Sequence, residues 1–102
     1  MTTEIRTWSF LTNHAQVLLC ISDDPASRLR DISERVGITE RAAHRIVSEL
    51  VEGGYVVRER HGRRNRYEIK PDRPLPHSVV KGKAVGDLLE LIGTLSEDGR
   101  RS

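Results

Sequence analysis

The stretch from residue 29 to residue 55 constrains the fold of this chain most, because its apolar residues recur at helical spacing on both sides of one glycine. Leu29, Ile32 and Val36 fall on one face of a first helix. Gly37 follows directly, where a helix end often needs a residue that tolerates positive φ. The pattern therefore predicts a short helix that ends in a tight turn at Gly37.

A second helix is predicted to begin after the N-cap Thr39 and to end at Gly53 and Gly54. Its predicted core face is aliphatic and consists of Ala43, Val47 and Leu50. Two helices joined by a short glycine-containing turn are typical of a helix-turn-helix unit. Solvated helices often have a polar outer face, but here the outer side chains also suit base edges and phosphates. The residues predicted to bind DNA from this helix are Thr39, Glu40, Arg41, His44, Arg45 and Ser48.

After the second helix the pattern changes to the period of β-strands. Strands are predicted at 55–60 and 66–70, with a polar turn at 61–65. Charged residues on an edge hairpin can serve solubility alone. Here, however, the basic residues of the hairpin up to position 66 are arginine or histidine, and the arginine guanidinium binds phosphate better than a lysine does, because it offers two parallel donors. We therefore interpret the hairpin as a DNA-binding wing. Its predicted contact residues are Arg58, Arg60, His61, Arg63, Arg64, Asn65 and Arg66.

Three prolines in residues 71–77 predict a stiff, extended linker. A last helix is predicted to span residues 78–96, roughly from Val79 to Leu95. Its apolar stripe consists of Val85, Leu88, Leu89, Ile92 and Leu95. This stripe either packs back on its own domain or forms a dimer seam, and the stiff linker favours dimerisation. Trp8 and Phe10 are assigned to the core or to an interface rather than to a ligand site.

The composition narrows the class of protein. A chain of 102 residues predicts one domain with at most one extra element. No apolar stretch reaches the roughly eighteen residues of a membrane span, and the N-terminus lacks the pattern of a secretory signal, so a cytoplasmic, nucleoid-associated protein is expected. Cys20 is predicted to be a buried hydrophobe. Because phosphate-loop, zinc and nucleophile motifs are missing, we expect neither an enzyme, a metal site nor a cofactor.

The order of a helix, a helix-turn-helix and a two-stranded wing resembles the winged helix-turn-helix transcription regulators of bacteria and archaea. The sequence LRDISERVGITERAAHRIVSELVEGGYVVRERHGRRNRYEI is similar to the DNA-binding part of the MarR and ArsR groups. Residues 8–15 also resemble short actinobacterial regulators that begin with W-[ST]-F-L-T-N-H-A. Over residues 8–70 the resemblance implies that the helix after Thr39 enters the major groove. It also implies that the wing touches the DNA backbone or the minor groove.

The predicted fold class is therefore mainly α with a small β-hairpin (α+β), a winged helix-turn-helix with an extra C-terminal helix. The leading functional hypothesis is a homodimeric, sequence-specific regulator of double-stranded, pseudo-palindromic DNA. The alternative is a winged-helix module that contacts another protein without sequence-specific DNA binding. The sequence leaves open whether a small-molecule effector binds between the DNA-binding domain and the last helix.

Overall fold

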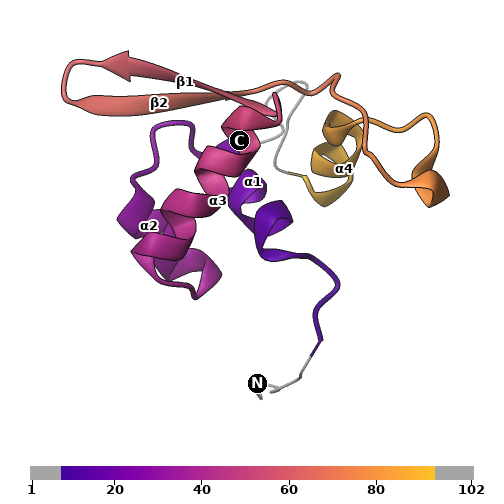
Figure 1. Cartoon of the computed structure of the whole chain (residues 1–102), viewed down its shortest axis with the longest axis horizontal. Helices are drawn as coiled ribbons and strands as arrows, with labels where there is room; N and C mark the ends of the chain where they lie inside the picture. Colours follow the sequence, from indigo (N-terminus) through magenta and orange to yellow (C-terminus); the bar gives the residue numbers. More distant parts are fainter. Residues whose placement is uncertain (1–7, 94–102) are drawn as a thin grey trace.

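A computed structural model describes residues 8–93 of the chain (Figure 1). It contains four α-helices, one short 3-10 helix and a two-stranded antiparallel hairpin, which confirms the predicted α+β winged helix-turn-helix with an additional C-terminal helix. The elements in chain order are α1 (Asn13–Asp23), α2 (Leu29–Val36), α3 (Glu40–Glu52), β1 (Val56–His61), β2 (Arg64–Ile69), the 3-10 helix η1 (Ser78–Val80) and α4 (Val85–Ile92).

Local capping sets the bounds of the first three helices. The Thr12 hydroxyl accepts from the Ala15 N–H at 3.1 Å, and the Thr39 hydroxyl accepts from the Ala42 N–H at 3.0 Å, so both threonines cap helices. Helix α2 begins after its N-cap Arg28 without a side-chain cap, and the Ser27 hydroxyl just before it donates to the Asp24 carbonyl. The turn between α2 and α3 therefore has a cap at each end, Gly37 at the end of α2 and Thr39 at the start of α3.

Gly37 ends α2 in the left-handed conformation, with φ at +88°. A Cβ at this position would meet no atom within 4 Å, so only the backbone conformation disfavours a side chain. We expect Gly37→Ala to lower the free energy of unfolding by about 1–2 kcal/mol. Urea denaturation measures this loss. Gly37→Asn is the matched control, because asparagine tolerates this region better, and an equal loss in both variants would contradict the explanation.

The hydrophobic core lies where the four helices and the base of the hairpin meet. Its largest fully buried side chains are Ile21, Ile32, Ile46, Leu89, Val17, Val47, Val56 and Val85. Ala43, Val47 and Leu50 face this core as predicted, and Ile46 joins them on the same face of α3. The outer face of α3 therefore points away from every core element.

The hairpin has a shorter turn than predicted. Arg64 pairs with His61 and Asn65 pairs with Arg60, so His61, Arg64 and Asn65 belong to the strands and only Gly62 and Arg63 form the turn. Gly62 has φ at +66° and no non-glycine residue within 8–93 has positive φ, a combination that fits a type II′ turn. The predicted five-residue turn is wrong because Gly62 allows a two-residue connection. The hairpin is therefore a regular two-stranded ribbon (Figure 1). Both of its strands contain arginines.

The C-terminal region differs from the prediction. Residues 71–77 do not hold the last helix at a distance, because their backbone pairs with residues 83–86: the Leu75 N–H donates to the Lys83 carbonyl and the Gly86 N–H to the Pro71 carbonyl. A Cβ on Gly86 would lie only 2.8 Å from the Pro71 Cβ, so glycine permits this approach. The prediction of one helix within 78–96 is wrong within the described residues: Gly82, with φ at +76°, separates η1 from α4.

The predicted dimer stripe is divided by this packing. Val85 and Leu89 are 1% and 0% exposed and belong to the domain's own core, so they are not available for a seam between two copies. Leu88 is half-buried and Ile92 is 46% exposed. Leu95 lies outside the described residues. The apolar stripe of α4 thus mainly completes its own domain.

Candidate nucleic-acid interface

The outer face of α3 presents the side chains that the sequence selected. Thr39, Glu40, Arg41, His44 and Arg45 are exposed, and Ser48 is half-buried. The Thr39 hydroxyl already serves as the helix cap, which limits its part in any contact. Arg41, His44 and Arg45 line one shallow depression with Thr39 and Ala42. The structure therefore brings Thr39, Arg41, His44 and Arg45 together on one accessible surface, and Ser48 does not line it.

A second hollow, which we call the wing groove, separates α3 from the hairpin. It has a volume of about 640 Å³. Arg41 and His44 from α3 line one side, and Asn65 and Tyr67 from β2 line the other. The start of α2 adds residues that the sequence analysis missed, namely Arg28 and Arg30. Nothing in the periodicity of α2 marks these two arginines as partners of the wing.

The strand register assigns the wing residues to two faces. Directly opposed residues of an antiparallel pair share a face, and neighbours along a strand alternate. Arg58 opposes Tyr67 and Arg60 opposes Asn65, so these side chains lie on the face that lines the wing groove. The other face carries the remaining wing residues predicted on the strands, His61, Arg64 and Arg66. Arg63 occupies the turn itself.

Two wing arginines also stabilise the protein. The Arg64 guanidinium donates to the Ala26 carbonyl at 2.6 Å, which fixes the hairpin to the loop before α2. The Tyr67 N–H donates to the Pro25 carbonyl in the same loop. The Arg60 Nε donates to the Gly62 carbonyl and supports the turn. Arg58, Arg63 and Arg66 make no such contact within residues 8–93.

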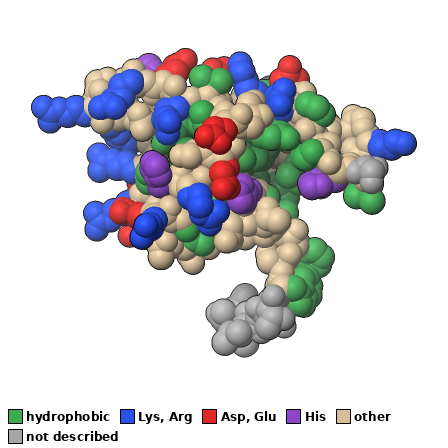
Figure 2. All heavy atoms as spheres, viewed as in Figure 1, with side chains coloured by type: hydrophobic (Ala, Val, Ile, Leu, Met, Phe, Trp, Pro, Cys, Tyr) green, Lys and Arg blue, Asp and Glu red, His purple; other side chains and the backbone are tan. Residues whose placement is uncertain are grey.

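The positive charge is unevenly distributed over the molecule. Figure 2 shows Lys and Arg side chains gathered over the side that carries the hairpin, α2 and α3. The chain as a whole has a formal net charge of only +2, so this concentration reflects placement rather than composition. A local basic surface of this kind attracts the phosphate backbone of nucleic acid.

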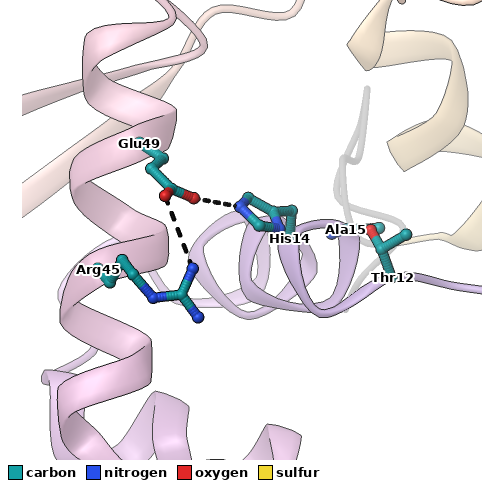
Figure 3. Close-up of polar contacts among 5 residues, drawn as sticks. All are labelled: Thr12, His14, Ala15, Arg45 and Glu49. Atoms are coloured by element: carbon teal, nitrogen blue, oxygen red, sulfur yellow. Dashed lines mark hydrogen bonds and ion pairs between the residues drawn. The ribbon is translucent and has the colours of Figure 1, made fainter.

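Helix α1 contacts α3 through a chain of polar side chains that the sequence did not predict (Figure 3). The His14 Nε2 lies 2.6 Å from the Glu49 Oε1, and the Arg45 Nη1 lies 3.6 Å from the Glu49 Oε2. The hydrogen bond from His14, and secondly the charge of Arg45, hold the pKa of Glu49 below its ordinary value. Because the carboxylate is ionised, the His14 Nε2 carries the hydrogen and donates it. Arg45 is thus partly committed to Glu49.

This contact predicts a pH dependence. A carboxyl with a lowered pKa in the folded state contributes stability above its unfolded pKa, and this contribution is lost as the pH falls through its folded pKa. We expect His14→Ala to raise the pKa of Glu49, because the largest cause of its shift is removed. Carboxyl ¹³C NMR titration measures it. His44→Ala is the control, and an unchanged Glu49 titration in His14→Ala would contradict the assignment.

Other chemistry has little support within the described part of the chain. Cys20 is buried, and burial raises the pKa of its thiol, so the thiol stays protonated and poorly nucleophilic. Residues 8–93 hold no cluster of three or more His, Cys, Asp or Glu side chains suited to a metal ion. None of the helices in this range is both long and apolar enough to cross a membrane.

Helices α2 and α3 and the tight turn at Gly37 form a helix-turn-helix unit, with α1 packed beside them. Residues 11–60 match the family model of the IclR helix-turn-helix domain. The match covers α1, α2, α3 and most of β1. It supports a helix-turn-helix transcription regulator that binds DNA, and it does not confirm the predicted resemblance to the MarR and ArsR groups in particular. A search of curated proteins found no significant match to the chain.

Proposed function

We propose that this protein is a sequence-specific regulator of transcription that places α3 in the major groove of double-stranded DNA and the wing on the adjacent backbone or minor groove. The wing groove carries this proposal. Arginines from α2 and α3 lie on one side of it, and the polar end of β2 lies on the other. A phosphate backbone that follows this groove would bring base edges toward the outer face of α3.

Each group of residues has a distinct role in the proposal. Arg41 and His44 on α3 read base edges, and Arg45 does so when it leaves Glu49. Arg28 and Arg30 bind phosphates from the start of α2. Arg58, Arg63 and Arg66 bind phosphates from the wing. Such a regulator works where DNA is accessible, so we place it in the cytoplasm.

Arg63 provides the cleanest test of the wing. Arg64 is less suitable, because Arg64→Ala also removes the contact with the Ala26 carbonyl. We expect Arg63→Ala to weaken binding to all DNA sequences alike and to lower the slope of log affinity against log salt by about one. Fluorescence anisotropy at several salt concentrations measures both effects. Arg63→Lys keeps the charge and should keep the slope; a change of base preference in Arg63→Ala would contradict a phosphate role.

We also propose a homodimer, whose seam keeps Ile92 of the predicted stripe and joins it to Phe10 instead of to Val85 and Leu89. Phe10 and Ile92 are exposed apolar residues that line the same hollow, beside Leu19 of α1. Phe10 packs edge-to-face on Trp8, with ring centroids 4.9 Å apart. This patch lies outside the domain's own core and is a natural seam between two copies. A two-fold dimer would place its α3 helices roughly 34 Å apart and would select a pseudo-palindrome.

Selection from a pool of random-sequence duplexes, at two salt concentrations, tests the proposed function. An enriched two-fold motif, with affinity that falls steeply as salt rises, would support a dimeric sequence-specific regulator. A single enriched half-site would support sequence-specific binding by a monomer and overturn the proposed homodimer. Salt-dependent binding without any enriched motif would overturn the claim of specificity, and the absence of binding would overturn the function.

A further inference from the structure

A groove on the side of α3 away from the wing is not used by the proposed DNA contacts. It has a volume of about 540 Å³, within the range of small-molecule sites. We call it the apolar groove. Its walls come from the start of α1, the end of α3, the connection after the hairpin, and α4. Figure 2 shows hydrophobic side chains gathered between the body of the domain and this connection, with acidic and histidine side chains at the edge.

The lining combines an apolar body with one charged group. Leu18, Leu50, Leu75 and Leu88 are among the aliphatic side chains that line it. Within the described residues, no lysine or arginine lines the groove; Glu49 is its one carboxylate, and His14 and His77 also line it. The lowered pKa of Glu49 keeps this carboxylate ionised at neutral pH. The charge offered to an occupant is therefore negative.

Aromatic rings add to the preference for a cation. Phe10 and Tyr55 line the same groove as Glu49. The faces of such rings attract positive charge; one face of the Tyr55 ring already has the Arg73 guanidinium carbon 5.6 Å from its centroid, which leaves its other face and the Phe10 ring for an added cation. A carboxylate, two aromatic rings and aliphatic walls together complement an apolar molecule that carries a positive charge.

We propose that the apolar groove binds a small apolar organic cation, with its charged group at Glu49 and its hydrophobic body against the leucines of α1, α3 and α4. The positive group would occupy the side of the carboxylate that now faces His14 or Arg45 (Figure 3). No bond forms or breaks in this step. The site needs neither DNA nor a second copy of the chain.

A ligand in the apolar groove would also affect Arg45 on the proposed DNA-binding surface. Glu49 holds Arg45 at 3.6 Å, and Arg45 lines the depression on the outer face of α3. A cation that pairs with Glu49 weakens this hold and frees Arg45 for DNA. This second part rests on the proposed function, and it predicts that the ligand and DNA bind with positive cooperativity.

A matched pair of ions tests the site without DNA. Tetraphenylphosphonium and tetraphenylborate have nearly the same size and shape but opposite charge. Isothermal titration of the full chain should show binding of the cation and at least twofold weaker binding of the anion. Glu49→Gln should weaken cation binding about two- to fivefold. Glu52→Gln is the control, because Glu52 is exposed on the same helix and does not line the groove.

The outcomes separate the site from the function. Equal binding of both ions, no binding of the cation, or an unchanged affinity in Glu49→Gln would overturn the site. If the cation binds, saturating amounts should tighten DNA binding about two- to threefold in the wild type and not in Arg45→Ala. An unchanged DNA affinity in the wild type would overturn the coupling. Cation binding by a protein that binds no DNA would leave the site standing and refute the proposed function.

Discussion

Replacing Leu89 with alanine is expected to lower the free energy of unfolding by about 2–5 kcal/mol. Leu89 is 0% exposed and packs in the same core as Ile21, Ile46 and Val85. The alanine variant would lose this burial and leave a cavity, because the backbone pairing between residues 71–75 and 83–86 keeps α4 in place. Urea denaturation, monitored by circular dichroism, measures the loss.

Leu91 provides the matched control. It lies two residues further along the same helix and is 81% exposed, so Leu91→Ala should change the free energy of unfolding by less than about 0.5 kcal/mol. The two substitutions remove the same atoms from the same helix. Similar effects in both variants would contradict the packing of α4 into the core, and would return the helix to the detached, dimer-forming role that the sequence suggested.

Replacing Arg41 with alanine is expected to cost about 1–3 kcal/mol of binding free energy on the selected DNA and to relax the preference at one base pair. Arg41 is exposed near the start of α3 and lines both the wing groove and the depression on the outer helix face. The depression also holds His44 and Arg45. Arg45→Ala should relax the preference at a neighbouring base pair, with a similar or smaller loss because Arg45 first leaves Glu49.

Lys81→Ala controls for the lost charge. Lys81 is exposed in the connection before α4. This connection lies at the other end of the molecule from the tip of the hairpin (Figure 1). The Lys81→Ala variant should keep nearly the same DNA affinity and base preference as the wild type. Selection from a random pool, repeated with each variant, gives the preference, and anisotropy gives the affinity. If Arg41→Ala bound all sequences with the wild-type pattern of preference, the proposed role of Arg41 in reading bases would be wrong.

The helix-turn-helix could be predicted because local signals carry it. The spacing of Leu29, Ile32 and Val36, and the glycine at position 37, act within one or two helical turns. The caps of α1 and α3 are equally local. Ile46 joins the core beside positions that were predicted, because it lies on the same face of α3.

The C-terminal region could not be predicted in the same way. Prolines at positions 71, 74 and 76 suggested a spacer, but the carbonyls of Pro71 and Arg73 accept backbone hydrogen bonds from α4. This pairing depends on residues more than ten positions apart, and on the small size of Gly86. An apolar stripe alone does not distinguish a surface that packs on its own domain from one that packs on a second copy.

The candidate site shows the same division. The residues of α3 and of the wing follow from the polar face of a helix and from an arginine-rich hairpin. Arg28 and Arg30 join them only because the start of α2 faces β2 across the wing groove. The contact between His14 and Glu49 joins residues 35 positions apart, and no local sequence pattern predicts it.

The most direct test of the account is a map of the DNA-contacting surface by NMR. Backbone amide and arginine side-chain shifts of the labelled protein would be followed as a selected duplex is added. The account predicts the largest changes at the outer face of α3, at Arg28 and Arg30, and along the wing, with little change at Leu88 and Leu91 of α4. Changes concentrated on α4 and around Phe10, with none on α3, would contradict DNA reading by the helix-turn-helix.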